Sequence, residues 1–72
     1  MTKEALLKKL GKKVVSLREK QGISSSELAR LCGKDRQNIH KFENGEFNPS
    51  IYYLSEIATA LKISLSEITD VD

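Results

Sequence analysis

Several residue types and patterns are scarce or absent in this 72-residue chain. A single cysteine allows no internal disulfide, and together with one histidine it is too little for a zinc-ligand set. Tryptophan is absent, and aromatic residues make up only 6%. No apolar run approaches the roughly 18 residues of a membrane-spanning helix. The start at Met1-Thr2-Lys3 leads into an amphipathic pattern, not a signal peptide. We therefore expect no metal site, no membrane partner and a reducing cytoplasmic compartment.

The remaining composition is ordinary for a small helical domain. Hydrophobic residues make up 39% and charged residues 31%, which is too apolar for a disordered chain. A chain of this length forms one domain, close to the lower limit at which core burial alone supports folding. We therefore treat residues 1–72 as a single domain.

Charge is unevenly distributed along the chain. The net charge of +2 is too small to indicate nucleic acid binding by itself. Residues 1–20, however, hold seven Lys or Arg against two Glu, whereas residues 46–72 hold one Lys against five Asp or Glu. A basic front and an acidic rear would orient the domain toward a polyanion. The alternative is that the lysines only form a solvated helix face.

Apolar residues at every third or fourth position predict helices over most of the chain. Ser64 and Glu67 form a capping box that opens a short last helix. The expected elements are helices over about 2–21, 25–32 and 36–44, a fourth helix after Ser50 and a fifth after Ser64. The fourth should bury an apolar stripe of Ile51, Leu54, Ile57, Ala58 and Leu61. The fold class is therefore all-α, with five short helices around one core.

The central stretch 25–44 has the signals of two short helices joined by a tight turn. Ser24 and Glu27 match the S-x-x-E capping box, and Asp35 is a suitable N-cap for the second helix. Gly33 between them permits a positive φ and so a sharp reversal. Two helices joined in this way form a helix-turn-helix, whose second helix lies in the major groove of DNA.

The second helix of this unit has two unlike faces. At about 100° per residue, Ile39, Phe42 and Glu43 cluster on one side, and the apolar pair must be buried. The opposite side carries long hydrogen-bonding side chains, namely Gln37, Lys41 and Asn44, flanked by Arg36 and His40. Arginine pairs bidentately with guanine and glutamine with adenine, each worth roughly 1–3 kcal/mol of discrimination. The alternative is an ordinary solvent-facing polar side.

A set of motifs extends from Leu10 to Ile68 at matching spacing. They are Leu10-Gly11, Leu17-Arg18, Gly22-Ile23-Ser24, Glu27-Leu28-Ala29, Gly33, Ile39, Glu43-Asn44-Gly45, Asn48-Pro49-Ser50 and Ala58-x-x-Leu61. With these motifs the sequence resembles the Cro and phage-repressor type of helix-turn-helix regulator, the xenobiotic-response-element family. The resemblance implies a lambda-repressor-like domain and a transcriptional regulator, such as a repressor, that binds double-stranded DNA. It also implies a bacterial or phage protein associated with the nucleoid.

The resemblance assigns roles to individual residues. Family members usually contact base edges with the first, second and sixth residues of the recognition helix, here Arg36, Gln37 and Lys41. The family's usual phosphate contacts correspond to Ser25 and Asn44. Further candidates for contacts to the DNA backbone are Lys34, Asn38 and His40. A partly buried ion pair, commonly formed in the family, would join Arg18 to Glu43. Such a pair explains a carboxylate on the apolar side of a helix, because an unpaired buried charge costs several kcal/mol.

The chain departs from the family pattern at four positions. Ser25 replaces a glutamine, so a longer contact is lost there. Cys32 replaces a larger aliphatic residue, and we interpret it as a small core residue and not a reactive thiol. Lys34 replaces an apolar residue, which would free a charge to meet phosphate. Lys62 replaces a glycine, with a strain of about 1 kcal/mol if its conformation is left-handed.

A homodimer on a palindromic operator is expected, because one recognition helix reads too few base pairs for useful specificity. The candidate interface residues are Tyr52, Tyr53, Leu65, Ile68 and Val71. Tyrosine suits an interface because it combines a large apolar area with a polar tip. For Leu65 and Ile68, closure of the monomer core is an equal alternative.

Other functions have less support in the sequence. His40 and the serines at 24–26 are the only candidates for a base and a nucleophile, and no acidic residue is placed to orient the histidine. We expect no catalytic residues, no cofactor and no small-molecule ligand. The same fold also serves as an antitoxin or a protein-interaction adaptor, which is the main alternative function. Restriction–modification controllers are a plausible subtype of DNA-binding regulator.

Overall fold

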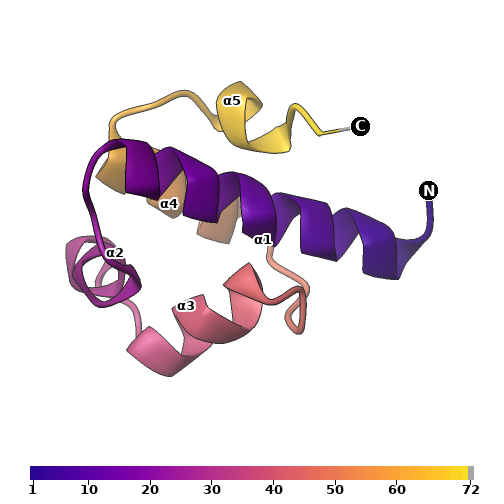
Figure 1. Ribbon diagram of the computed structural model, residues 1–72, viewed down its shortest axis with the longest axis horizontal. Helices are drawn as coiled ribbons and strands as arrows, with labels where there is room; N and C mark the ends of the chain where they lie inside the picture. The colour runs from indigo at the N-terminus through magenta and orange to yellow at the C-terminus, as the bar shows by residue number, and fades with distance from the viewer. Residues whose placement is uncertain (72) are drawn as a thin grey trace.

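The computed structural model describes residues 1–71 and has the five-helix, all-α fold expected from the sequence (Figure 1). The helices are α1 (Lys3–Lys20), α2 (Ser25–Cys32), α3 (Arg36–Glu43), α4 (Ile51–Leu61) and α5 (Leu65–Thr69). Their bounds lie within one residue of those predicted for the first three helices. No helix among residues 1–71 is both long and apolar enough to span a membrane.

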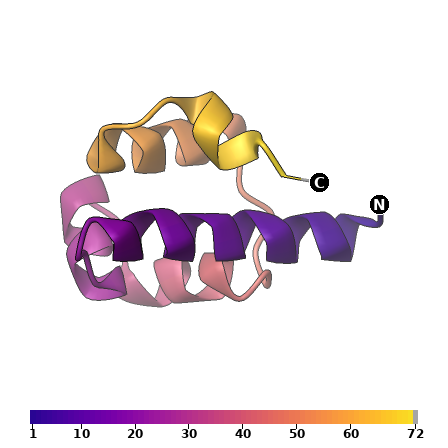
Figure 2. The same ribbon diagram turned by 45° about the horizontal axis from the view of Figure 1, so that its top comes forward.

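Helix α1 crosses the middle of the molecule and organises the other four. It packs against α3 on one side and α5 on the other, while α4 packs against α2 and α5. Figure 2 shows α4 and α5 on one side of α1 and α3 on the opposite side. The helix-turn-helix formed by α2 and α3 is therefore held against a platform made by the rest of the chain.

The core is formed by apolar side chains from all five helices. Val14, Leu28, Ile39, Ile57 and Ile68 are completely buried, one from each helix. Leu17 of α1 is half-buried and packs against this core. Burying a side chain of this size contributes roughly 1.5–3 kcal/mol, so the core is the main source of stability.

Side-chain caps determine where the helices begin. The N-cap residues accept hydrogen bonds from backbone N–H groups of the first turn; they are Thr2, Ser24, Asp35, Ser50 and Ser64. The capping box predicted at Ser64 and Glu67 is complete. At α2 only the bond from the Glu27 N–H to the Ser24 hydroxyl forms, and the Glu27 carboxylate lies 3.7 Å from Arg30 instead.

Two turns have the left-handed backbone that the sequence suggested. Gly33 ends α2 with φ of 66°, which reverses the chain toward α3. Lys62 ends α4 with φ of 58°, although it carries a side chain. The expected strain at Lys62 is therefore present, at about 1 kcal/mol.

Burial on α4 and α5 bears on three sequence-based assignments. Tyr53 of α4 is 8% exposed and Ile68 of α5 is completely buried, so both belong to the monomer core and not to a dimer interface, which for Ile68 is the alternative stated above. Tyr53 is enclosed because Phe42 and Phe47 pack against its ring, with centroids 5.8 and 4.8 Å away. Ile51, predicted to join the buried stripe, is 66% exposed as the first residue of α4.

Candidate nucleic-acid interface

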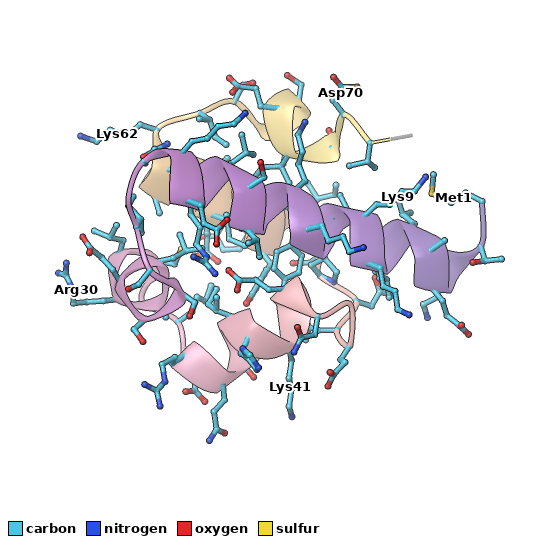
Figure 3. All side chains as sticks on the ribbon, viewed as in Figure 1. Met1, Lys9, Arg30, Lys41, Lys62 and Asp70 are labelled. Atoms are coloured by element: carbon cyan, nitrogen blue, oxygen red, sulfur yellow. The ribbon has the colours of Figure 1, made fainter. Side chains whose placement is uncertain are left out.

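Helix α3 turns one face into the protein and the other outward. Ile39 and Phe42 are 0% and 1% exposed, and Glu43 beside them is 8% exposed. On the outer side the side chains are all exposed; they are Arg36, Gln37, Asn38, His40 and Lys41. Figure 3 shows Lys41 pointing away from the body of the molecule. The inner face therefore fixes the helix, and the outer face is free to bind.

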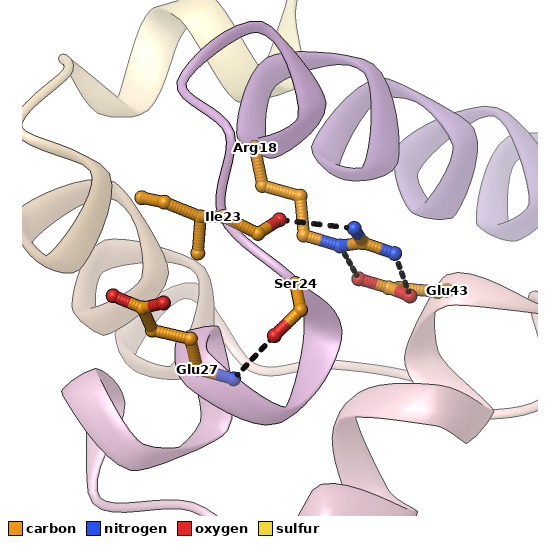
Figure 4. Close-up of polar contacts among 5 residues, drawn as sticks. All are labelled: Arg18, Ile23, Ser24, Glu27 and Glu43. Atoms are coloured by element: carbon orange, nitrogen blue, oxygen red, sulfur yellow. Dashed lines mark hydrogen bonds and ion pairs between the residues drawn. The ribbon is translucent and has the colours of Figure 1, made fainter.

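An ion pair holds the C-terminal end of α3 against α1. The Arg18 Nε donates to Glu43 Oε2 at 2.7 Å and its Nη2 donates to Oε1 at 3.0 Å. The Arg18 Nη1 also donates to the Ile23 carbonyl oxygen at 3.1 Å, at the start of the helix-turn-helix (Figure 4). This bidentate hydrogen bonding to Glu43 raises the pKa of Arg18. One guanidinium thus connects α1, the turn before α2 and the end of α3.

A close backbone approach adds to this positioning, and the sequence pattern did not assign it a role. Gly11 of α1 lies against the last carbonyls of α3. A Cβ placed on Gly11 would lie 2.4 Å from the Glu43 carbonyl oxygen and 2.6 Å from that of Phe42. Any larger residue would push α3 away, so Gly11 contributes to the orientation of the outer face.

A groove of about 520 Å³ brings most of the expected DNA-contacting residues together. It is lined by Ser25, Ser26, Arg36, Gln37, His40, Lys41 and Glu46. The first turn of α2 and the outer face of α3 form its two sides. Because the first N–H groups of a helix favour anions, the Ser25 side of this groove suits a phosphate.

Two of these lining residues were missed by the sequence reasoning. Ser26 follows Ser25 in the first turn of α2, so its neighbour could have indicated it. Glu46 follows α3, and its N–H donates to the Lys41 carbonyl oxygen at 2.9 Å, which folds the turn back toward the groove. Only the turn geometry reveals that an acidic residue lies beside Lys41.

Asn44 lies outside this groove. It caps the end of α3, where its N–H donates to the His40 carbonyl oxygen at 3.1 Å. Its side chain lines a second groove between α3 and α1, together with Lys8, Lys12 and Lys20. The expected backbone-contacting residues are therefore divided between two neighbouring surfaces.

Lys34 does not offer the free charge expected from the sequence. Its ammonium forms an ion pair with Glu56 of α4 and lies 4.9 Å from the centre of the Tyr53 ring. Its side chain is only 23% exposed. The two partners are 22 residues apart, so only the packing of α2 against α4 brings them together. The charge that the sequence suggested for DNA is therefore directed toward α4 in this structure.

Comparison with known proteins identifies the family. A family model described as helix-turn-helix matches residues 14–68, more than half of the chain. The chain belongs to the Cro/C1-type helix-turn-helix family of transcriptional regulators. This family consists of regulators, in agreement with the expectation that the chain is not an enzyme.

Sequence relatives within this family include phage and bacterial proteins. The chain is 32% identical over 59 residues to the ImmF control region 10 kDa protein of Bacillus phage phi105, covering 82% of the chain and 66% of that protein. It is 28% identical over 64 residues to the regulator SlrR of Bacillus subtilis, covering 88% and 42%. Overall, the chain spans between 16% and 66% of the length of the first three curated relatives.

Solved structures show the same fold. The restriction-modification controller protein C.AhdI from Aeromonas hydrophila superposes with a TM-score of 0.87 and 38% identity, covering 89% of this chain and 97% of that one. A helix-turn-helix transcriptional regulator from Vibrio cholerae gives a TM-score of 0.88 and 28% identity, covering 93% and 38%.

The thiol of Cys32 fits a packing role in this family member. Burial raises its pKa, so the group remains a thiol and not a reactive thiolate. Its Sγ lies 3.9 Å from the Glu56 carbonyl oxygen. Among residues 1–71, no group of three or more His, Cys, Asp or Glu is arranged to hold a metal ion.

Proposed function

We propose that this chain is a sequence-specific, double-stranded DNA-binding transcriptional regulator, with α3 in the major groove. The observation that carries the proposal is the division of α3 into two faces. The Arg18–Glu43 ion pair and the buried Ile39 and Phe42 fix the helix, while Arg36, Gln37 and Lys41 share one exposed groove. Such a prearranged polar face binds without a large ordering cost.

The proposed roles follow from hydrogen-bonding capacity. Arg36 reads the O6 and N7 of guanine, Gln37 reads the N6 and N7 of adenine, and Lys41 contacts a base or a phosphate. Ser25 and Asn44 hold phosphates at the two ends of the helix-turn-helix. At the Ser25 end, the positive N-terminus of α2 adds to the attraction. Asn38 and His40 are exposed on α3 and make secondary backbone contacts.

The first test is selection of bound sites from random DNA at two salt concentrations. Wild-type protein should yield one preferred sequence, and Arg36→Ala and Gln37→Ala should each relax one base position with a loss of about 1–3 kcal/mol. Arg30→Ala is the matched control, because its side chain is 71% exposed on α2 and pairs only loosely with Glu27 (Figure 3). Retention of the full site preference by both α3 variants would rule out α3 as the reading helix.

The protein also forms a two-fold dimer in this proposal. Two recognition helices about 34 Å apart read successive major grooves on one side of the duplex. The exposed apolar residues on α2 and α4 supply a surface: Leu31 is 44%, Ile51 66% and Tyr52 72% exposed. Leu31 and Tyr52 line one shallow groove with Cys32 and with small residues of α4. Leu65 and Val71 are half-buried against the core and could contribute only to the rim of the dimer interface.

Sedimentation at micromolar concentration tests the dimer. The wild type should sediment as a dimer, and Tyr52→Glu should sediment as a monomer, because a charge in an apolar interface is unpaired. Thr59→Glu places a charge elsewhere in the same groove and should weaken the dimer less than Tyr52→Glu does. A wild-type protein that remains monomeric on saturating DNA would contradict the dimer while leaving DNA binding intact.

The similarity to C.AhdI over nearly the whole of both chains favours a restriction–modification controller as the regulatory subtype. Such a regulator works in the cytoplasm, where the DNA lies. The selected binding site should then occur upstream of a restriction or modification gene in the source genome. A site found only beside unrelated genes would reject this subtype.

A further inference from the structure

The lysines of α1 do not form one uniform solvated face. Lys8 and Lys12 are four residues apart and therefore share one side of the helix. They line the groove of about 900 Å³ that also contains Asn44 and Lys20. Lys9 and Lys13 line another groove with Asp70 near the end of the chain, and Lys12 lines that groove too. Lys8 therefore belongs to the first groove alone, Lys9 and Lys13 belong to the second, and Lys12 lies between the two.

The Lys8 side of α1 is in direct contact with the turn that follows the recognition helix. A Cβ placed on Gly45 would lie 2.7 Å from Lys8 Cγ and 3.0 Å from Lys8 Cα. Figures 1 and 2 both show the N-terminal end of α1 extending past α3 and α4. The groove runs along α1 between Lys8 and Lys20 and is bordered on its other side by the end of α3 at Asn44.

The two pairs also differ in electrostatic surroundings. Asp70 lies in the groove lined by Lys9, Lys12 and Lys13, which places a negative charge on that side of α1 and none beside Lys8 in that groove. In the groove of Lys8 and Lys12, the Glu43 carboxylate is already bound by Arg18, and Glu19 lies toward the other end of α1. Two lysines at i and i+4 repel each other by a few tenths of a kcal/mol. A polyanion in this groove would relieve that repulsion.

We infer that Lys8 and Lys12, together with Asn44, form a second phosphate-binding groove that holds the DNA backbone outside the base pairs read by α3. This inference rests on the proposed function, because it takes α3 as the helix in the major groove. The Cα atoms of Lys8 and Lys12 lie about 6 Å apart along the helix axis. Phosphates of one strand rise about 3.4 Å per nucleotide, so the pair covers a length of about two nucleotides of the flanking duplex.

The test compares two duplexes that share the selected site. One has two flanking base pairs on each side and the other has ten. The double variant Lys8→Gln/Lys12→Gln is measured against Lys9→Gln/Lys13→Gln, which removes the same charge from the side of α1 that faces Asp70. Circular dichroism of both variants establishes that the helices are intact, and Lys8→Gln alone, which changes the first groove only, replaces the double variant if they are not.

On the long duplex, Lys8→Gln/Lys12→Gln should lower the slope of log affinity against log salt by about 1.8, or about 0.9 per phosphate contact. On the short duplex it should match the wild type, and the control pair should change neither slope by more than half of that amount. An equal loss from both pairs, or an unchanged slope on the long duplex, would overturn the inference.

The proposed function fails separately, and by a different readout. If the wild type shows no site preference on either duplex, α3 does not read DNA. If it prefers the site but binds both duplexes with the same salt slope, only the flanking groove is wrong. Ethylation of the flanking phosphates provides a second readout, since it should weaken the wild type and leave Lys8→Gln/Lys12→Gln unaffected.

Discussion

The two faces of α3 are built from the same eight residues but obey different constraints. The inner face is almost inaccessible and is fixed by aromatic packing, a bidentate ion pair and the backbone of Gly11. The outer face is exposed, and its side chains in the groove make few contacts with the rest of the chain. Changes on the inner face should therefore alter stability, and changes on the outer face should alter only binding.

This separation explains how one fold can serve many operators. The inner face determines where the helix lies, and its residues are limited by shape and by paired charge. In the proposed complex the outer face would determine which bases are contacted, and substitution there would leave the core unchanged. Function in this family therefore resides in a few exposed positions on a common scaffold.

The largest expected effect comes from Phe42→Ala on the inner face. Phe42 is 1% exposed and packs edge-on against Tyr53. Its removal should lower the free energy of unfolding by roughly 3–5 kcal/mol, a large share of the total for so small a domain. Thermal denaturation followed by circular dichroism measures this loss. A melting temperature shifted by only a degree or two would show that α3 is not anchored by this ring.

Gly11→Ala should have the next largest effect and tests the backbone approach between α1 and α3. Alanine favours an exposed helix by about 1 kcal/mol over glycine, yet here its Cβ would meet the carbonyls of Phe42 and Glu43. We expect a net destabilisation of about 1–3 kcal/mol, with weaker DNA binding because α3 is displaced. Ser16→Ala, at an exposed position of α1, is the control. A stabilised Gly11→Ala protein would show that the two helices can separate without loss.

Much of this fold could be predicted because its signals are local. Helix starts followed from capping residues such as Ser24 and Asp35, which bond the adjacent turn. The assignment of Tyr53 failed because its burial depends on Phe42 and Phe47, which periodicity within α4 does not reveal. The same is true of Lys34, whose partner comes from another helix.

The candidate site divides in a similar way. Its outer-face residues follow from helical periodicity, whereas the Arg18–Glu43 pair was expected only from the family resemblance. The contact of Gly45 with Lys8 could not be inferred, because no sequence pattern gives the angle between α1 and α3.

Tyr53→Phe should change the free energy of unfolding by a smaller amount and with the opposite sign. Tyr53 lies on α4 and packs against Phe42 of the inner face. The Tyr53 hydroxyl is buried and has no hydrogen-bond partner among residues 1–71. Removing it should raise the free energy of unfolding by about 1 kcal/mol, the lower end of the penalty for an unsatisfied buried group. Tyr52→Phe, at a 72% exposed position, should leave the monomer's stability unchanged. A destabilised Tyr53→Phe protein would mean that the hydroxyl is bonded in solution.

The same variant should change the response to alkaline pH. Burial raises the pKa of Tyr53 to about 12, above the value near 10 expected in the unfolded chain. As the pH rises, Tyr53 therefore loses its proton first in the unfolded state. The free energy of unfolding is unaffected by this group below pH 10 and falls as the pH rises from 10 toward 12. Denaturant unfolding of Tyr53→Phe should show a shallower decline over that window than the wild type.

The smallest expected effect on stability comes from two lysines with different surroundings. Lys34 is paired inside the protein, whereas Lys41 is exposed on the outer face of α3. Lys34 is tied to Glu56 in a partly exposed ion pair, so Lys34→Gln should lower the free energy of unfolding by no more than about 1 kcal/mol. Because its ammonium is directed toward α4, the salt dependence of DNA binding should be unchanged. Lys41→Gln should instead leave stability unchanged and lower the salt slope by about 0.9 if Lys41 contacts a phosphate. A unit loss of slope from Lys34→Gln would return Lys34 to the DNA interface.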